Sequence, residues 1–169
     1  MDLKNIIFCG KTSFNVNSNK YKQYLLEKIN YPEILNRINY KYYNNSTGDI
    51  LLKNDYFVSK KTKGNIYILL LYTDILNNKI CLFIDSKTCN GYIYPRINLV
   101  NYKFSENLYN YTYFTGELLF EEDKWSFIIN DIHYYCNTIV YNLPFIERLY
   151  KIHNILNTMY SRDSNDICN

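Results

Sequence analysis

The chain has 169 residues, 47% of them hydrophobic, and a formal charge of +3. This length fits one domain with its own core, and the charge is too small to indicate a nucleic-acid or membrane surface by itself. No run approaches the roughly 20 apolar residues that span a bilayer, and the first residues lack a secretory signal, so we expect a cytoplasmic protein without membrane contact. Five cysteines without CxxC spacing indicate neither a disulfide framework nor a zinc site, and we expect reduced, mostly buried thiols.

The first part of the chain has helical spacing. An apolar face with a period of 3.6 follows the possible cap residues Ser18 and Asn19. Pro32 ends this helix and, as a residue tolerated at a first helical position, opens a second short helix through Ile38. The apolar face of the first helix consists of Tyr21, Leu25, Leu26 and Ile29.

From residue 56 the period changes to that of strands. Short runs of β-branched and aromatic residues at 56–59, 65–72, 80–85 and 92–94 are separated by polar or glycine turns. The runs 114–120 and 125–131 flank the acidic turn 121–124, which indicates a hairpin. These runs predict an antiparallel meander that ends at Asp131.

Pro144 begins a final helix, and residues 161–169 are a polar tail that we expect to be frayed. We therefore predict an α+β fold, an antiparallel sheet with flanking helices, as a single domain over residues 1–169. The apolar stripe predicted to pack on the sheet is Ile146, Leu149, Ile152 or His153, Leu156 and Met159.

One segment resembles an active-site signature. Residues 61–64 read Lys-Thr-Lys-Gly after a strand that contains an aromatic residue and a valine. They resemble the Lys-x-Asp-Gly signature of the covalent nucleotidyltransferases, the family of mRNA guanylyltransferases and DNA and RNA ligases. In that family the lysine attacks the α-phosphate of a nucleoside triphosphate, so the resemblance makes Lys61 the candidate nucleophile.

Further pieces resemble the family in its order. The strand 80–85 is similar to the one that capping enzymes end in Ile-Asp-Arg, with Ser86 at the arginine position. Residues 114–118, Phe-Thr-Gly-Glu-Leu, resemble the Asp-Gly-Glu-Leu strand. Residues 125–132 end in Asn-Asp-Ile where the family has Phe-Asp-Ile, and 144–149 resemble the Pro-Phe-x-x-Arg-Leu start of the next helix. The resemblance covers about residues 56–156 and implies the fold of a guanylyltransferase nucleotide-binding lobe.

The resemblance also implies roles for individual residues. Lys63 would meet a phosphate as a point charge, Glu117 the ribose, and Gly64 and Asp131 would complete the nucleotide site, with GTP or ATP and Mg²⁺ as ligands. Lys60 and Lys63 would lower the pKa of Lys61, as a nucleophilic lysine requires. Three departures weaken this site: the signature aspartate is replaced by Lys63, the usual arginine by Ile66, and the acidic residue before Gly116 by Thr115.

Missing elements argue against a complete enzyme. The sequence stops at Asn169, before the family's later acidic strand and Lys-x-Lys element, and has no room for the oligonucleotide-binding fold. We therefore expect a degenerate subunit that is not catalytic alone and binds a nucleotide, an RNA 5′ end or a partner protein, a capping enzyme or RNA polymerase subunit. The Tyr-, Asn-, Ile- and Lys-rich composition is typical of an A+T-rich genome and favours a viral source.

Two other functions stay open. In the first, Lys61 is a true nucleophile and a second chain supplies the missing motifs. In the second, the sheet is a scaffold whose tyrosine-rich face docks a larger protein. The lysines at 60, 61 and 63 would then be a solvated basic turn, and Glu117 and Asp131 exposed strand positions. Elsewhere, Trp125 and His153 are interpreted as packing residues, and His133 with Cys136 does not make a metal site.

Overall fold

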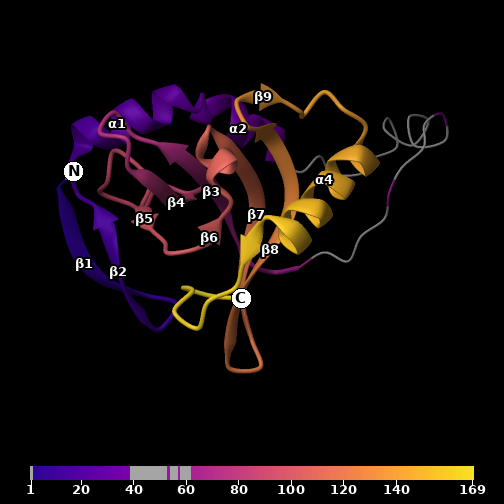
Figure 1. The fold of residues 1–169 in the computed structure, drawn as a ribbon. Helices are drawn as coiled ribbons and strands as arrows, with labels where there is room; N and C mark the ends of the chain where they lie inside the picture. The colour runs from indigo at the N-terminus through magenta and orange to yellow at the C-terminus, as the bar shows by residue number, and fades with distance from the viewer. Residues whose placement is uncertain (1, 39–52, 54–56, 58–61) are drawn as a thin grey trace.

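The computed structural model describes residues 2–38, 53, 57 and 62–169. In this part of the chain eight strands form one open antiparallel sheet, in the order β1-β2-β5-β4-β3-β7-β8-β9 (Figure 1). Their bounds are β1 Leu3–Phe8, β2 Lys11–Val16, β3 Asn65–Thr73, β4 Lys79–Asp85, β5 Ile97–Leu99, β7 Thr112–Glu121, β8 Lys124–Tyr135 and β9 Thr138–Ile139. A second, two-stranded sheet pairs β6 (Lys103–Phe104) with β10 (Tyr160–Ser161). The described helices are α1 Asn19–Lys28, α2 Tyr31–Ile38 and α4 Phe145–Thr158, with a short 3₁₀ helix, η1, at Glu106–Tyr109.

The central strands β3 and β4 are buried on both faces of the sheet. Along β3, Leu69 and Leu71 belong to the core on one face, while Ile68 and Leu70 belong to the core on the other. This explains why the two strands have continuous apolar runs rather than alternation, since both sides of the pleat exclude water. The structure thus has a mixed fold with a large antiparallel sheet, in agreement with the predicted α+β class.

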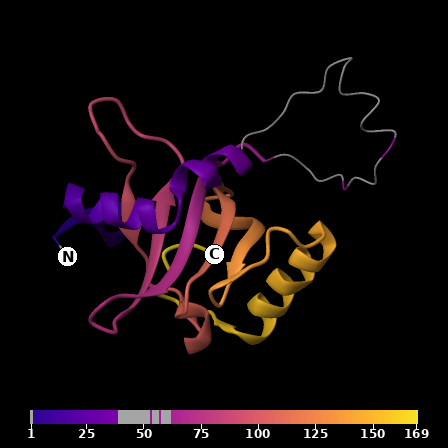
Figure 2. The same ribbon diagram turned by 90° about the horizontal axis from the view of Figure 1, so that it is seen from above.

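The helices α1 and α2 cover the face of the sheet that carries Ile68 and Leu70 (Figure 2). The Ser18 hydroxyl caps α1 by accepting a hydrogen bond from the Tyr21 amide at 3.3 Å, as the sequence predicted. Ile34 of α2 is buried, and the Tyr31 hydroxyl donates to the carbonyl of Asp85 at the end of β4 (2.7 Å). Both predicted helices are therefore confirmed, and α2 is tied directly to a central strand.

The opposite face is covered by η1, by α4, which lies beside β8 (Figure 2), and by the last residues described. From α4, Ile152 and Ile155 enter this core. The predicted stripe is confirmed only in part. Ile152 is buried and Met159 packs against this core, whereas Ile146, Leu149 and Leu156 are 38%, 40% and 39% exposed, and His153 is also exposed. The buried side of α4 differs from the predicted one because the contact with β8 decides which side chains are covered.

The tail is not frayed as predicted. Ile167 and Cys168 are buried in the core of the same face. Asn169 pairs alongside β8, because its carbonyl accepts from the Phe127 amide (2.8 Å) and its amide donates to the Trp125 carbonyl (3.0 Å). Trp125 is partly buried and packs against this core, close to its predicted role. Polar composition misled the prediction because backbone pairing, which any residue can make, fixes this segment.

The hairpin of β7 and β8 confirms the prediction around the acidic turn. Glu122 and Asp123 form a two-residue connection with φ of 51° and 58°, a left-handed pair that matches the twist of the strands. Gly116 in β7 is required by close packing, since a Cβ there would lie 2.3 Å from the carbonyl oxygen of Ile128. Irregular pairing next to Gly116 bends the hairpin at the centre of the sheet.

Two other predictions on the strands were wrong. The hairpin of β1 and β2 was missed, because these mostly exposed strands carry many polar residues and only one short apolar run, Ile6–Phe8. Residues 92–94 are not a strand, and Ile97–Leu99 pairs with β4 instead. The predicted strand 56–59 lies outside the described residues apart from Phe57. In the described part of the chain, no helix is long and apolar enough to cross a membrane.

Candidate functional site

The start of β3 and the middle of β7 bring together the loop and the carboxylate of the predicted site. Pairing of Ile66 with Glu117 places this carboxylate beside the residues that precede β3. The Thr62 hydroxyl donates to Oε2 of Glu117 at 2.6 Å, and the Gly64 amide donates to the same atom at 3.0 Å. Glu117 is only 3% exposed. It is therefore a buried group that fixes the loop, and not an exposed strand residue.

Gly64 is required at this position by the closeness of β7. A Cβ on Gly64 would lie 2.7 Å from Cδ2 of Leu119, 2.8 Å from the Leu118 carbonyl oxygen and 2.9 Å from Cβ of Glu117. Real Cβ atoms do not approach so closely, so a larger residue would push the loop off the strand. The glycine that the sequence singled out is thus explained by packing against β7.

Of the lysines of the predicted site, Lys60, Lys61 and Lys63, the structure describes only Lys63. Lys61, the candidate nucleophile, and Lys60 lie outside the described residues, so the structure does not place them. Lys63 is described and exposed, between Thr62 and Gly64, whose polar groups bind Glu117. A lysine in this position is held by its backbone while its side chain stays accessible to an anionic ligand.

Asp131, the other predicted acidic residue, is engaged by an arginine of α4. Nε of Arg148 lies 2.7 Å from Oδ1 of Asp131, and Nη2 lies 3.0 Å from Oδ2. The same guanidinium also donates to the carbonyls of Tyr141 and Leu143, and so fastens the segment between β9 and α4. This two-pronged pair is a strong structural contact. A nucleotide contact by Asp131 would have to compete with it.

A buried histidine lies on the same two strands. Thr115, which takes the place of the family's acidic residue and pairs with Asp131, has its hydroxyl 3.0 Å from Nε2 of His133. The His133 ring stacks on Tyr113 with centroids 5.4 Å apart. Burial lowers the pKa of His133 to about 4, and Arg148 and Arg37 act in the same direction while Asp131 opposes them. His133 is therefore neutral near pH 7.

Asp85, which matches the aspartate of the family's Ile-Asp-Arg strand, is also buried. Its Oδ1 accepts from the Lys87 amide at 2.9 Å, and its Oδ2 lies 3.3 Å from Nη2 of Arg96 and 3.4 Å from the Tyr67 hydroxyl. Sequence reasoning missed Arg96, which lies ten residues beyond Ser86, the position compared with the family's arginine. Only the return of the chain along β5 brings this guanidinium back to Asp85.

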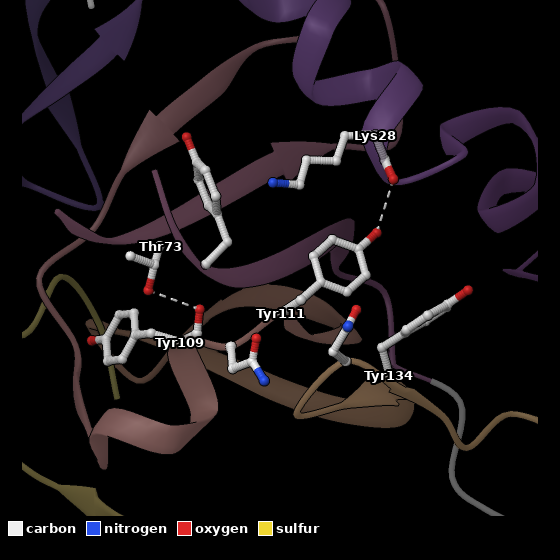
Figure 3. Close-up of a pocket in the computed structure, with 8 residues that line it drawn as sticks. Lys28, Thr73, Tyr109, Tyr111 and Tyr134 are labelled. Carbon is white, nitrogen blue, oxygen red and sulfur yellow. Dashed lines mark hydrogen bonds between the residues drawn. The ribbon is translucent and has the colours of Figure 1, made fainter. Parts of the chain in front are cut away.

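A second cleft, of about 440 Å³, lies at the other end of β3 (Figure 3). Nζ of Lys28, at the end of α1, lies 5.3 Å from the centre of the Tyr72 ring. Tyr111 adopts a left-handed φ of 60°, unusual for a bulky residue, and its hydroxyl donates to the Lys28 carbonyl at 3.1 Å. None of the described residues around the cleft is acidic; the others are Thr73, Tyr109, Asn110, Tyr134 and Asn137.

The described residues do not make a metal centre. Over 2–38, 53, 57 and 62–169, no group of three or more His, Cys, Asp or Glu side chains is placed to hold a metal ion. His133 and Cys136 in particular have different partners. His133 contacts the Thr115 hydroxyl, while the backbone amide of Cys136 donates to the Thr112 hydroxyl at 3.0 Å.

Comparison with models of known protein families gives no match to this sequence, and comparison with curated proteins gives none either. The resemblance to the nucleotidyltransferases therefore depends on the motifs quoted above and on the geometry in which their described residues meet.

Proposed function

We propose that this chain is a degenerate guanylyltransferase-like subunit of an mRNA capping or transcription complex, of viral origin, that binds a nucleotide or an RNA 5′ end and is not catalytic alone. The observation that carries the proposal is the contact between two separate motifs: the loop 62–64 is fixed by its hydroxyl and amide on the buried Glu117. Two motifs that resemble one family in sequence thus meet in space.

The charge of the loop supports an anionic ligand. Lys63 is exposed beside the fixed backbone of Thr62 and Gly64, and the sequence adds Lys60 and Lys61 immediately before it. Three lysines in four residues suit the phosphates of a nucleotide or of an RNA 5′ end. Glu117 accepts hydrogen bonds from the loop and so fixes its shape. It would therefore support binding through the conformation of the loop, as well as through any contact with the sugar.

Few carboxylates at the family's acidic positions are left to bind a catalytic metal ion. Thr115 stands at an acidic position of the family and bonds His133, while Asp131 and Asp85 are engaged by Arg148 and Arg96. Mg²⁺ prefers carboxylate oxygens that are open to it. We therefore favour a binding subunit over an enzyme that acts alone.

A thermal-shift titration tests the proposal. We expect GTP, ATP or a cap analogue, with Mg²⁺, to raise the Tm by roughly 5–10 °C at a hundred times its Kd. The shift should disappear in Lys61→Ala and weaken in Lys63→Ala, and it should persist in Lys20→Ala, an exposed lysine of α1. Absence of any shift would contradict nucleotide binding. A shift lost only in Lys28→Ala would move the site to the cleft of Figure 3.

The split-enzyme alternative has its own test. If a second chain supplies the missing motifs, radiolabelled GTP or ATP should leave an amine-linked nucleotide, stable to alkali and labile in acid, on the wild type and none on Lys61→Ala. Candidate partners are added one at a time, from capping and polymerase subunits. No labelling with any of them would end this alternative.

The scaffold alternative is favoured by one feature of α4. Its side chains Ile146, Leu149 and Leu156 are more than one third exposed, along one side of the helix. A protein that docks there should bind the Lys61→Ala variant as tightly as the wild type and lose affinity for Leu149→Asp. Loss of binding in Lys61→Ala would count against the scaffold.

A further inference from the structure

A cysteine occupies an unusual place in the turn between β1 and β2. Cys9 and Gly10 form this two-residue turn with φ of 51° and 75°. Left-handed positions in such turns favour Asn, Asp and Gly, because other side chains crowd the backbone there. A cysteine at the first of them points to a role for the thiol itself.

The thiol of Cys9 meets Cys168, at the other end of the chain. Both cysteines line one cleft, Cys9 packs against the core cluster that contains Cys168, and both are free thiols in this structure. In Figure 1 the turn between β1 and β2 lies beside the yellow C-terminal segment. The Lys11 ammonium also spans this junction, donating to the carbonyls of Ser164 (3.0 Å) and Asp166.

Cys168 lies in surroundings that favour its thiolate. The Tyr102 hydroxyl is 2.7 Å from Sγ of Cys168. The pKa of Cys168 is lowered, first by the hydrogen bond from Cys9 and then by Tyr102 and Lys11, whereas burial and Asp166 oppose the shift. The pKa of Cys9 is raised, because it donates to its partner and is partly buried. We assign Cys168 as the nucleophile, because the Tyr102 hydroxyl contacts its sulfur and can stabilise the thiolate.

The pair is also accessible to a small reagent. A cleft of about 530 Å³ is lined by both cysteines and by Lys11, Trp125 and Arg162. Cys168 is mostly buried, 7% exposed, so an oxidant has to reach it from this cleft. Access and thiolate character are the two properties that make a cysteine sensitive to oxidation.

We propose that Cys9 and Cys168 form a reversible disulfide on exposure to a peroxide, and that this bond clamps the C-terminal segment to the edge hairpin of β1 and β2. The Cys168 thiolate attacks one oxygen of hydrogen peroxide, the O–O bond breaks, and the other oxygen leaves with a proton as water. The Cys9 thiol then attacks the sulfenic sulfur, the S–S bond forms, and a second water leaves. Two thiols lose two electrons, and the peroxide is reduced to water.

The experiment uses the whole purified chain. After treatment with one equivalent of hydrogen peroxide and blocking with N-ethylmaleimide, we expect an intact mass corresponding to loss of two hydrogens and blocking of three thiols. Peptide mapping should join Cys9 to Cys168 and leave Cys81, Cys89 and Cys136 unlinked. Dithiothreitol added to the oxidised protein before blocking should restore all five reactive thiols. A different cysteine pair, or oxidation of Cys89 alone, would overturn the proposal.

Variants separate this pair from general thiol oxidation. Cys9→Ser and Cys168→Ser should both abolish the cross-link, and Cys89→Ser should leave it intact. Tyr102→Phe should slow its formation at least ~3-fold, because the thiolate loses one of its hydrogen bonds. Equal rates in Tyr102→Phe and the wild type would contradict the assignment of Cys168 as the nucleophile.

The clamp has a separate readout. Because the disulfide would close almost the whole chain into one loop, we expect the oxidised wild type to melt roughly 5 °C or more above the reduced form. This measurement needs no variant, so it holds even if a substitution impairs folding. An unchanged or lowered Tm of the cross-linked protein would overturn the clamp.

Discussion

Two carboxylates on neighbouring strands are held in different ways. Asp131 of β8 binds the forked guanidinium of Arg148 from α4, at 2.7 and 3.0 Å. Glu117 of β7 accepts from a hydroxyl and a backbone amide of the loop before β3. The first contact joins two large elements, while the second shapes a short loop that carries an exposed lysine. Of the two acidic residues that the sequence proposed for a nucleotide site, Glu117 is therefore the better placed to serve binding, and Asp131 to serve stability.

The largest effect should come from breaking the ion pair of Asp131. In Arg148→Met, the carboxylate would keep only the Ile132 amide at 2.8 Å, and the carbonyls of Tyr141 and Leu143 would lose their donor. Because the pair is mostly buried, we expect the free energy of unfolding to fall by roughly 3–4 kcal/mol in urea denaturation.

The matched control is Arg148→Lys, which restores the charge without the fork. It should recover part of the loss only, since a single ammonium cannot bond both oxygens and the two carbonyls. A loss below about 1 kcal/mol in Arg148→Met would show that Asp131 is no more structural than Glu117.

The buried His133, two residues beyond Asp131 on β8, makes the stability depend on pH. His133 has a folded pKa of about 4 against 6.5 in the unfolded chain, because burial disfavours its charged form. The unfolded chain therefore takes up a proton first, so this contribution is complete above pH 6.5 and is lost as the pH falls towards 4. The loss of unfolding free energy amounts to about 3 kcal/mol at pH 4.

Urea denaturation of the wild type and His133→Gln at pH 7, 5.5 and 4 checks this expectation. The difference in unfolding free energy between the two should change by about 3 kcal/mol over that range, in the direction that penalises the wild type at low pH. If the unfolding free energies of the two proteins instead change in parallel with pH, folding does not lower the pKa of His133.

The smallest effect should come from Glu117→Gln. The amide oxygen can still accept from Gly64, so the loop keeps this contact while the negative charge is lost, and we expect a fall of about 1 kcal/mol. Hydrogen exchange at the Gly64 amide should become faster. Glu121→Gln, an exposed position on the same strand, is the control and should change neither. A loss as large as that in Arg148→Met would remove the contrast between the two carboxylates.

Where the sequence carries a long apolar run or a cap, prediction succeeded. The strands β3, β4, β7 and β8 and the starts of α1 and α4 follow from apolar runs, from Ser18 and from Pro144. The hairpin of β1 and β2 and the final residues were missed, because backbone pairing and single contacts hold them rather than a pattern of side chains. The phase of α4 also required the position of β8, which no local spacing contains.

The same division applies to the candidate site. Lys63, Gly64, Glu117 and Asp131 were selected by resemblance alone, and the structure brings Gly64 to Glu117 through the register of β3 and β7. The partners Arg96 and Arg148 decide how tightly the acidic residues are engaged. Arg96 lay outside every quoted motif, and the pairing of Arg148 with Asp131 was not foreseen, because contacts across strands and helices depend on tertiary distance.

The two-sided burial of the central sheet has a consequence during synthesis. The side chains that cover one face, from α1 and α2, leave the ribosome before β3 and β4, whereas α4 and Ile167 emerge after these strands. Until then the face that carries Leu69 and Phe83 has no cover from these elements. A nascent chain in this state is open to aggregation and to capture by chaperones.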